Sequence, residues 1–231
     1  MARAVLTDIE GTTTPIAFVK DVLFPYARLH LAAFIAARHR DPVVAAALQD
    51  VATIVGCRGD DHAHITNTLI AWTDADSKAT ALKSLQGMIW ADGYASGALR
   101  ATVYPDAAAQ LRRWHVQGHA LFVYSSGSVQ AQRLLFAHSD QGSLLSLFSG
   151  YFDTAIGAKR EPASYRNIAQ QISRPSADFI FLSDVTAELD AARAAGMTTC
   201  WLVRANDIAP TAQDLAANTH PVASSFSEVT L

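Results

Sequence analysis

The chain has 231 residues, of which half are hydrophobic and 17% are charged, and its formal net charge is −3. This composition fits one large domain, or a core domain with a smaller inserted one, and excludes a disordered chain. The slight negative charge argues against a nucleic-acid-binding protein, which needs a basic face.

Cysteine content and the N-terminal sequence indicate a soluble protein of a reducing compartment. The sequence contains two cysteines and no CxxC motif, so we expect no disulfide framework. Asp8 and Glu10 interrupt the first apolar run too early for a signal peptide. The apolar run LAAFIAA at 31–37 is far shorter than the ~20 residues of a membrane helix. We therefore predict a cytoplasmic location and no membrane partner.

The first predicted element is a buried strand at residues 4–9 (AVLTDI), and an all-helical segment follows it. Residues 17–100 contain no convincing strand. One predicted helix in this segment has Asp41 as its N-cap, Pro42 at its first position and Gly56 at its end. Because the segment interrupts the chain after one strand, we expect an inserted cap domain that acts as a lid. Another of its helices places four apolar side chains on one face, namely Leu82, Leu85, Met88 and Ile89.

Beyond residue 100, predicted strands alternate with predicted helices, which implies right-handed βαβ units around a parallel sheet. We therefore predict an α/β protein with a Rossmann-like parallel-sheet core formed by residues 1–16 and 101–231, and with an inserted all-helical cap domain at 17–100. The helical patterns cover 105–118, 128–138, 161–173 and 186–196, and the strands cover 120–126, 178–184 and 200–203, with weaker ones at 151–156 and near 220–226.

Polar residues stand at the ends of the predicted strands. The carboxyl ends of parallel strands lie at one edge of the sheet, where ligands bind. Side chains two apart on a strand point the same way, so Asp8 and Glu10 can address one ligand. Gly11 permits a sharp turn, and the threonines at 12–14 offer hydroxyl and N–H groups to an anion. The other strand-end residues are Ser125 and Ser126, Lys159, and Ser183 with Asp184.

The charges at this edge indicate what it binds. Two like charges 4 Å apart repel by roughly 4 kcal/mol at an effective dielectric constant of 20. A phosphate beside Asp8, Glu10 and Asp184 therefore needs cations. Lys159 is one, and a divalent ion on Asp8 and Asp184 is a natural second, for which oxygen ligands and phosphate favour Mg²⁺. One carboxylate could then attack phosphorus while a second protonates the leaving oxygen.

These residues resemble the four motifs of the haloacid-dehalogenase-like phosphatases. The motifs are D-I-E-G-T at 8–12, a serine after the second core strand, Lys159, and Asp184 with Glu188 four residues later. The usual first motif has a second aspartate, and glutamate at this place is similar to one subgroup, the enolase-phosphatases (acireductone synthases) of methionine salvage. Longer segments carry the same resemblance, namely DIEGTTTPIAFVKDVLFPYA, YSSGSVQAQRLLFAHS, GYFDTAIGAKREPASYRNIA and HPVASSF.

The resemblance implies an activity, a cofactor and a monomer. Such enzymes enolise 2,3-diketo-5-methylthiopentyl-1-phosphate and then hydrolyse the phosphate to give the acireductone, with Mg²⁺ as cofactor. By position, Asp8 would be the nucleophile and a metal ligand. Glu10 would bind metal through its backbone carbonyl and act as general acid and base. Ser125 and Ser126 would hold the substrate phosphate, Lys159 would neutralise it, and Asp184 would complete the metal site.

Other functions stay open beside this one. A phosphatase of the same superfamily could act on another small phosphate ester. A phosphoacceptor receiver module is disfavoured by Glu10 and by the helical insertion, because signalling needs a stable aspartyl phosphate and no lid. A dinucleotide-binding enzyme is disfavoured because no GxGxxG follows a predicted strand. The proton removed during enolisation could go to Glu10 or to Lys159.

Several further residues have ordinary structural explanations. We expect Glu188 to be a supporting or helix-surface residue and not a metal ligand. The segment RAND at 204–207 replaces an expected proline-glycine turn, which we expect to change only a surface loop. We expect His62 and His64 to be surface or packing residues, Trp72 and Trp90 to pack the cap core, and Phe18, Lys20 and Phe24 to be better candidates for substrate contact.

Overall fold

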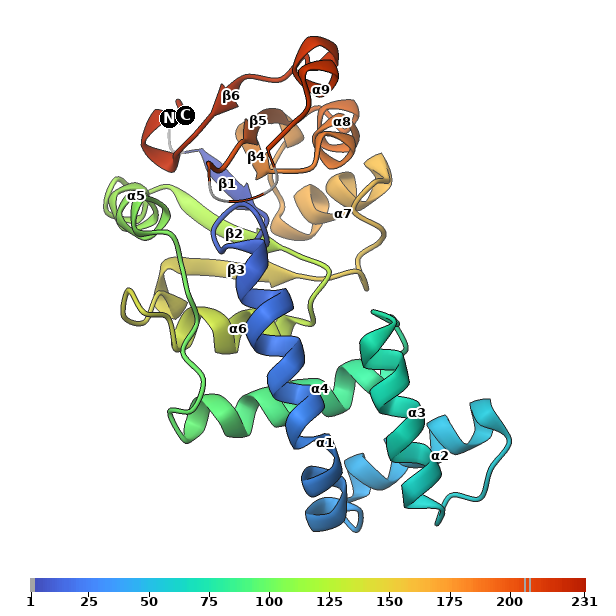
Figure 1. The fold of residues 1–231 in the computed structure, drawn as a ribbon. Helices are drawn as coiled ribbons and strands as arrows, with labels where there is room; N and C mark the ends of the chain where they lie inside the picture. Colours follow the sequence, from blue (N-terminus) through green and yellow to red (C-terminus); the bar gives the residue numbers. More distant parts are fainter. Residues whose placement is uncertain (1–2, 206, 208) are drawn as a thin grey trace. The chain divides into compact units, whose positions relative to one another are not determined.

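The computed structural model describes residues 3–205, 207 and 209–231, and the chain divides into two compact units (Figure 1). One unit comprises residues up to 18 together with 100–231, and the other comprises 19–99. The second unit starts two residues later and ends one residue earlier than the predicted cap domain at 17–100. Each unit has its own hydrophobic core.

A parallel sheet forms the centre of the larger unit, as predicted for an α/β fold. Its strands lie in the order β3-β2-β1-β4-β5-β6, so the N-terminal strand is flanked by neighbours on both sides. All pairings between adjacent strands are parallel. The carboxyl ends of the strands therefore share one edge. The strands are β1 (Ala4–Thr7), β2 (Ala120–Tyr124), β3 (Phe148–Phe152), β4 (Phe179–Ser183), β5 (Thr198–Leu202) and β6 (Val222–Ala223).

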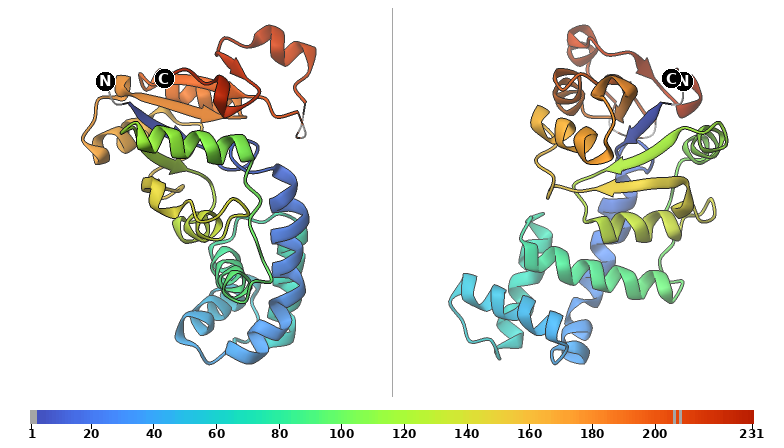
Figure 2. Two further views of the ribbon diagram at one scale, coloured as in Figure 1. Left: turned by 90° about the vertical axis from the view of Figure 1, so that its left-hand side faces the viewer. Right: turned by 180° about the vertical axis from the view of Figure 1, so that it is seen from behind.

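Helices cover both faces of this sheet. Helices α5 and α6 lie on one face, and α7 and α8 lie on the other (Figure 2). Alternate residues of the central strands, such as Leu6, Phe122 and Phe181, are buried in one cluster with Tyr165 of α7 and Leu189 of α8. This alternation follows from the two-residue period of a strand. The helices are α5 (Pro105–Val116), α6 (Val129–Ala137), α7 (Pro162–Ile172), α8 (Thr186–Ala194) and α9 (Ala212–Ala217), with short 3-10 helices at Leu145–Leu147, Ser176–Asp178 and Phe226–Glu228.

Several strands end earlier than their apolar sequences predict, and beyond two of them, β1 and β3, an aspartate side chain bonds to the backbone. The carboxylate of Asp8 accepts a hydrogen bond from Ile9 N at 2.7 Å, and the chain leaves the sheet after Thr7. The Asp153 carboxylate accepts one from Ala155 N at 2.9 Å. The predicted strand at 151–156 is therefore shifted toward the N-terminus as β3, and its last part forms a turn.

The smaller unit is helical, as the sequence predicts for 17–100. The predicted capping of α2 is confirmed: Asp41 accepts a hydrogen bond from Val43 N at 2.8 Å, and Gly56 ends the helix with a φ of 72°. A π-helical segment at Phe18–Leu23 precedes α1 and was not predicted. The α-helices are α1 (Phe24–Arg38), α2 (Pro42–Val55), α3 (His62–Asp74) and α4 (Thr80–Ala95).

The core of the helical unit contains the apolar face predicted for α4, with Leu82, Leu85 and Ile89 buried and Met88 packed against them. Trp72 and Trp90 pack against the same cluster, as predicted. The Trp90 indole N–H donates to Leu23 O at 2.8 Å. Among the described residues, no helix has both the length and the apolar character of a membrane span.

Candidate active site

Asp8 lies at the carboxyl end of β1 and is buried, with 5% of its surface exposed. The residue is fixed from several sides. Its backbone N–H donates to Leu182 O of β4 at 2.9 Å, and its own carbonyl accepts the hydroxyls of Thr7 and Thr13 at 2.9 and 3.3 Å. With Oδ1 bonded to Ile9 N, the carboxylate is held in a defined orientation.

Lys159 forms a buried ion-pair cluster with two carboxylates. Its Nζ lies 2.7 Å from Asp8 Oδ2 and 2.6 Å from Glu188 Oε2, and its side chain is 9% exposed. The loop after β3 carries Lys159, and Tyr165 of α7 holds this loop by donating its hydroxyl to Lys159 O at 2.7 Å. Glu188 belongs to the first turn of α8 and is buried. It therefore supports Lys159, and the alternative of a helix-surface position is wrong.

Burial and the neighbouring charges together raise the pKa values of Lys159, Glu188 and Asp184. Burial alone lowers the pKa of the Lys159 ammonium, but the carboxylates of Asp8 and Glu188 outweigh it and raise the pKa above its ordinary value. Burial, with the charge of Asp8, raises the pKa of Glu188. The same two causes raise the pKa of Asp184 to about 7. The three carboxyl groups of Asp8, Asp184 and Glu188 face the single ammonium group of Lys159. Ionising all three would leave excess negative charge, which is costly without a further cation.

Ser183, the last residue of β4, connects the two carboxylates of the cluster. Its hydroxyl lies 3.1 Å from Glu188 Oε2 and 3.4 Å from Asp8 Oδ2, and it accepts a hydrogen bond from Val185 N at 3.1 Å. One hydroxyl has one proton, so it donates to one carboxylate at a time. The sequence placed Ser183 at a strand end, and that position was the available signal for this contact.

The turn after Asp8 brings Asp184 into the site. Gly11 has a φ of +67°, which favours glycine, and a Cβ built there would lie 2.3 Å from Asp184 Oδ2. On the other side, the Asp184 backbone N–H donates to Thr12 Oγ1 at 3.1 Å. The missing side chain of Gly11 therefore lets the Asp184 carboxyl approach the turn directly. The threonines at 12–14 are buried.

The donor set fits a divalent cation. Asp184 Oδ1 is buried and has no hydrogen-bond partner among the described residues, which is unusual for a carboxyl oxygen. The Asp184 carboxyl lies against Gly11, and Asp8 stands three residues before this glycine. The backbones of Glu10 and Thr14, which precede and follow Gly11, are bridged. Within 3–205, 207 and 209–231, no three His, Cys, Asp or Glu side chains gather in metal-binding geometry. A cation here would therefore take oxygen ligands beyond the two aspartates, as Mg²⁺ commonly does with water and phosphate.

The other predicted site residues lie at or near the strand ends. Ser125 follows β2 and is buried; its N–H donates to Phe152 O at 3.2 Å and its hydroxyl accepts from Gly127 N at 3.2 Å. Ser126 is next in this loop before α6. Of the residues considered for substrate contact, Phe18 is buried, Lys20 is exposed, and Phe24 lies 6.2 Å from the Trp90 ring.

The expectation for the RAND segment is wrong, because Arg204 is not part of a simple surface loop. Arg204 is 5% exposed. Its Nε and Nη2 donate to Thr12 O at 3.0 and 2.7 Å, so it contacts the turn that follows Asp8. Residue 206 of the segment lies outside the described residues. Sequence reasoning missed Arg204, and its place directly after the predicted strand at 200–203 was the available signal.

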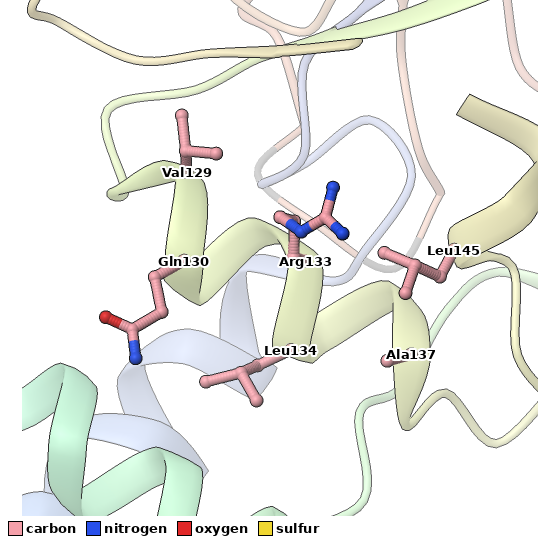
Figure 3. A pocket seen from close by; sticks show the side chains of 6 residues that line it. All are labelled: Val129, Gln130, Arg133, Leu134, Ala137 and Leu145. Atoms are coloured by element: carbon pink, nitrogen blue, oxygen red, sulfur yellow. The ribbon is translucent and has the colours of Figure 1, made fainter. Parts of the chain in front are cut away.

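A surface depression of about 490 Å³ lies along α6, apart from the residues described above (Figure 3). None of the predicted site residues lines it. The guanidinium of one lining residue, Arg133, lies 5.4 Å from the ring centroid of Tyr151. The lining residues are Val129, Gln130, Arg133, Leu134 and Ala137 of α6, together with Leu145.

Comparison with known proteins agrees with the geometry. Residues 2–196 match the family model of the haloacid dehalogenase-like hydrolases. The enolase-phosphatase E1 of Azotobacter vinelandii is 52% identical over 227 residues, which cover 98% of this chain and 96% of that protein. The chain belongs to the enolase-phosphatase family of haloacid dehalogenase-like hydrolases. The corresponding protein of Granulibacter bethesdensis is 56% identical over 205 residues, or 89% of this chain and 87% of that protein.

A solved structure supports the fold of this family member. The crystal structure of the UTR4 protein from Saccharomyces cerevisiae has a TM-score of 0.82 and 34% sequence identity to this chain. The match covers 99% of this chain and 100% of the yeast chain. The yeast protein and this chain therefore share one fold over their whole lengths.

The close approach of Asp184 to Gly11 generates a test of the site. In Gly11→Ala, the new Cβ would displace the Asp184 carboxyl, and we expect phosphate release to fall by at least about 100-fold, as for a misplaced catalytic group. The left-handed backbone should also cost about 1 kcal/mol of unfolding free energy. Steady-state phosphate release and urea unfolding measure the two effects.

Gly118→Ala is the matched control for this prediction. Gly118 has a φ of +83° in the same unit, and an added Cβ there meets nothing within 4 Å. It should therefore lose similar stability and keep its activity. If both variants remain fully active, Asp184 is not needed where the structure places it.

Proposed function

We propose that the enzyme converts 2,3-diketo-5-methylthiopentyl-1-phosphate to the acireductone 1,2-dihydroxy-3-keto-5-methylthiopentene and phosphate, in methionine salvage. The observation that carries the chemistry is the buried Asp8 carboxylate paired with Lys159 beside an unpartnered oxygen of Asp184. The choice of substrate is supported by membership of the enolase-phosphatase family, with relatives matching nearly the whole chain. Glu10, in place of the usual second aspartate, supports the same choice.

In the proposed phosphatase step, a carboxylate oxygen of Asp8 attacks the substrate phosphorus as the bond from phosphorus to the leaving oxygen breaks. Glu10 protonates that oxygen, and Ser125 and Ser126 hold the phosphate oxygens. Water then cleaves the aspartyl phosphate and regenerates Asp8. Lys159 lies 2.7 Å from Asp8 Oδ2, so it can neutralise negative charge that develops on the transferred group.

We infer that Mg²⁺ is the cation, held by the carboxylates of Asp8 and Asp184 and by the backbone carbonyl of Glu10. It would supply positive charge against the phosphate dianion. Hard oxygen ligands and a phosphorylated substrate are the setting in which Mg²⁺ is usual. We also infer a monomer in the cytoplasm. The cytoplasmic location is supported by Cys57 and Cys200, neither of which forms a disulfide.

We propose that the helical unit at 19–99 is a cap domain that excludes water while the reactive enol exists. This proposal is supported by the place of the unit in the sequence, between β1 and the other strands of the parallel sheet. If the unit closes on ligand, a bound substrate analogue should slow limited proteolysis near residues 18 and 100, where the two units join. Equal cleavage rates with and without the analogue would contradict the cap function.

The function is tested by following enol absorbance and released phosphate together, with the diketo-phosphate as substrate. We expect the enol to appear before phosphate, and we expect EDTA to stop phosphate release and added Mg²⁺ to restore it. Phosphate release in the absence of any metal would refute the proposed mechanism. Release only from other small phosphate esters would instead identify a phosphatase of the same superfamily with a different substrate.

Asp8→Asn tests the nucleophile. An amide cannot replace the carboxylate, so we expect turnover to fall by at least about 10,000-fold, toward the limit of detection, while the fold is retained. Asp178→Asn is the matched control, because Asp178 is exposed directly before β4, at the amino end of the sheet. Turnover by Asp8→Asn comparable to that of the control would remove Asp8 from this role.

A further inference from the structure

Arg204 is a buried arginine whose hydrogen bonds join three distant parts of the chain. Its Nε and Nη2 both donate to Thr12 O, at 3.0 and 2.7 Å. Its Nη1 donates to Asp106 Oδ2 at 2.8 Å and to Ser224 O at 3.2 Å. The rings of Tyr104 and Phe226 lie 4.3 and 5.2 Å from its guanidinium carbon. A planar guanidinium can satisfy such a set of partners at once, whereas an ammonium cannot.

Thr12, which accepts the hydrogen bonds from Arg204, also bonds to Asp184. Thr12 presents its carbonyl to Arg204 and its hydroxyl to the Asp184 backbone N–H, at 3.1 Å. The turn around Thr12 is narrow, because Ile9 O accepts the N–H groups of residues 12, 13 and 14 at 3.2, 2.9 and 2.9 Å. A shift of the Thr12 carbonyl would therefore move the hydroxyl that positions Asp184.

The chain at the end of this turn and beyond it is held by Tyr104 and by Asp207, which lies in the same loop as Arg204. Tyr104 N donates to Thr13 O at 2.9 Å. Asp207, three residues after Arg204, accepts a hydrogen bond from Ile16 N at 3.1 Å and another from the Tyr104 hydroxyl. The turn is thus held at Thr12 by Arg204, and the chain two residues beyond its end is held at Ile16 by Asp207. Of these two supporting side chains, Arg204 is the buried one and Asp207 is partly exposed.

We propose that Arg204 is a positioning residue for catalysis: through the Thr12 carbonyl it sets the Gly11–Thr14 turn against Asp184, and it does not touch the substrate. This inference rests on the proposed function for its effect on turnover. Its effect on the turn itself is independent of that function. A guanidinium bonded to a backbone carbonyl from two of its nitrogens restricts that peptide more than one point charge can.

Arg204→Lys tests the proposal, with Arg193→Lys as the matched control. Arg193 lies on α8, is about half exposed and pairs with Asp190, away from the turn. In Arg204→Lys we expect kcat for phosphate release to fall at least about tenfold, with KM changed by less than about threefold. We also expect amide hydrogen exchange in the peptide covering 9–14 to rise at least about tenfold, while peptides of α2 stay unchanged. Arg193→Lys should match the wild type in all of these measurements.

A second variant covers the case in which Arg204→Lys does not fold. Asp106→Asn removes a charged partner of Arg204 and leaves its bonds to Thr12 possible, so the same changes should appear at smaller size. Exchange at 9–14 equal to that of the control, or exchange raised equally throughout the chain, overturns the proposal. If the wild type fails to act on the diketo-phosphate, the proposed function is wrong, and the exchange measurement alone then decides the role of Arg204.

Discussion

The ammonium of Lys159 is the charge on which the arrangement of the site depends. It is buried between the carboxylates of Asp8 and Glu188, and each of these three residues comes from a different part of the fold: the end of β1, the loop after β3 and the start of α8. Removing one member of a buried ion pair typically costs 3–5 kcal/mol, because the remaining charge has no partner. The cluster therefore constrains those elements to one arrangement, and it keeps Asp8 oriented through the neighbouring backbone bonds.

Much of the fold and part of the site could be predicted from the sequence. Short apolar runs identify the strands, and parallel strands place their carboxyl ends on one edge, which is why Asp8, Lys159 and Asp184 could be expected to converge. The bounds of the strands could not be predicted to the residue. They depend on bonds between aspartate side chains and the backbone, as at Asp8 and Asp153, and an apolar pattern does not contain that information.

The supporting residues of the site were harder to predict, for a physical reason. Glu188 occupies a buried position on α8, where an apolar residue is ordinarily expected, and its partner Lys159 is remote in sequence. Arg204 is buried because Asp106, Tyr104 and Phe226 surround it, and each comes from another part of the chain. Local sequence shows a helix with a polar residue at Glu188 and a polar loop at Arg204, and neither pattern indicates the distant partners. The roles predicted for Asp8, Glu10, Ser125, Ser126, Lys159 and Asp184 stay predictions.

The central position of β1 in the sheet has a consequence for how the protein is made. This strand is synthesised well before its neighbours β2 and β4, which begin at residues 120 and 179. Asp8 therefore cannot meet Lys159 until most of the chain has left the ribosome. The four helices of the inserted unit, in contrast, pack among consecutive residues and can assemble earlier. The apolar strand β1 stays unpaired in the meantime, and unpaired strand edges with exposed apolar surface favour aggregation during folding.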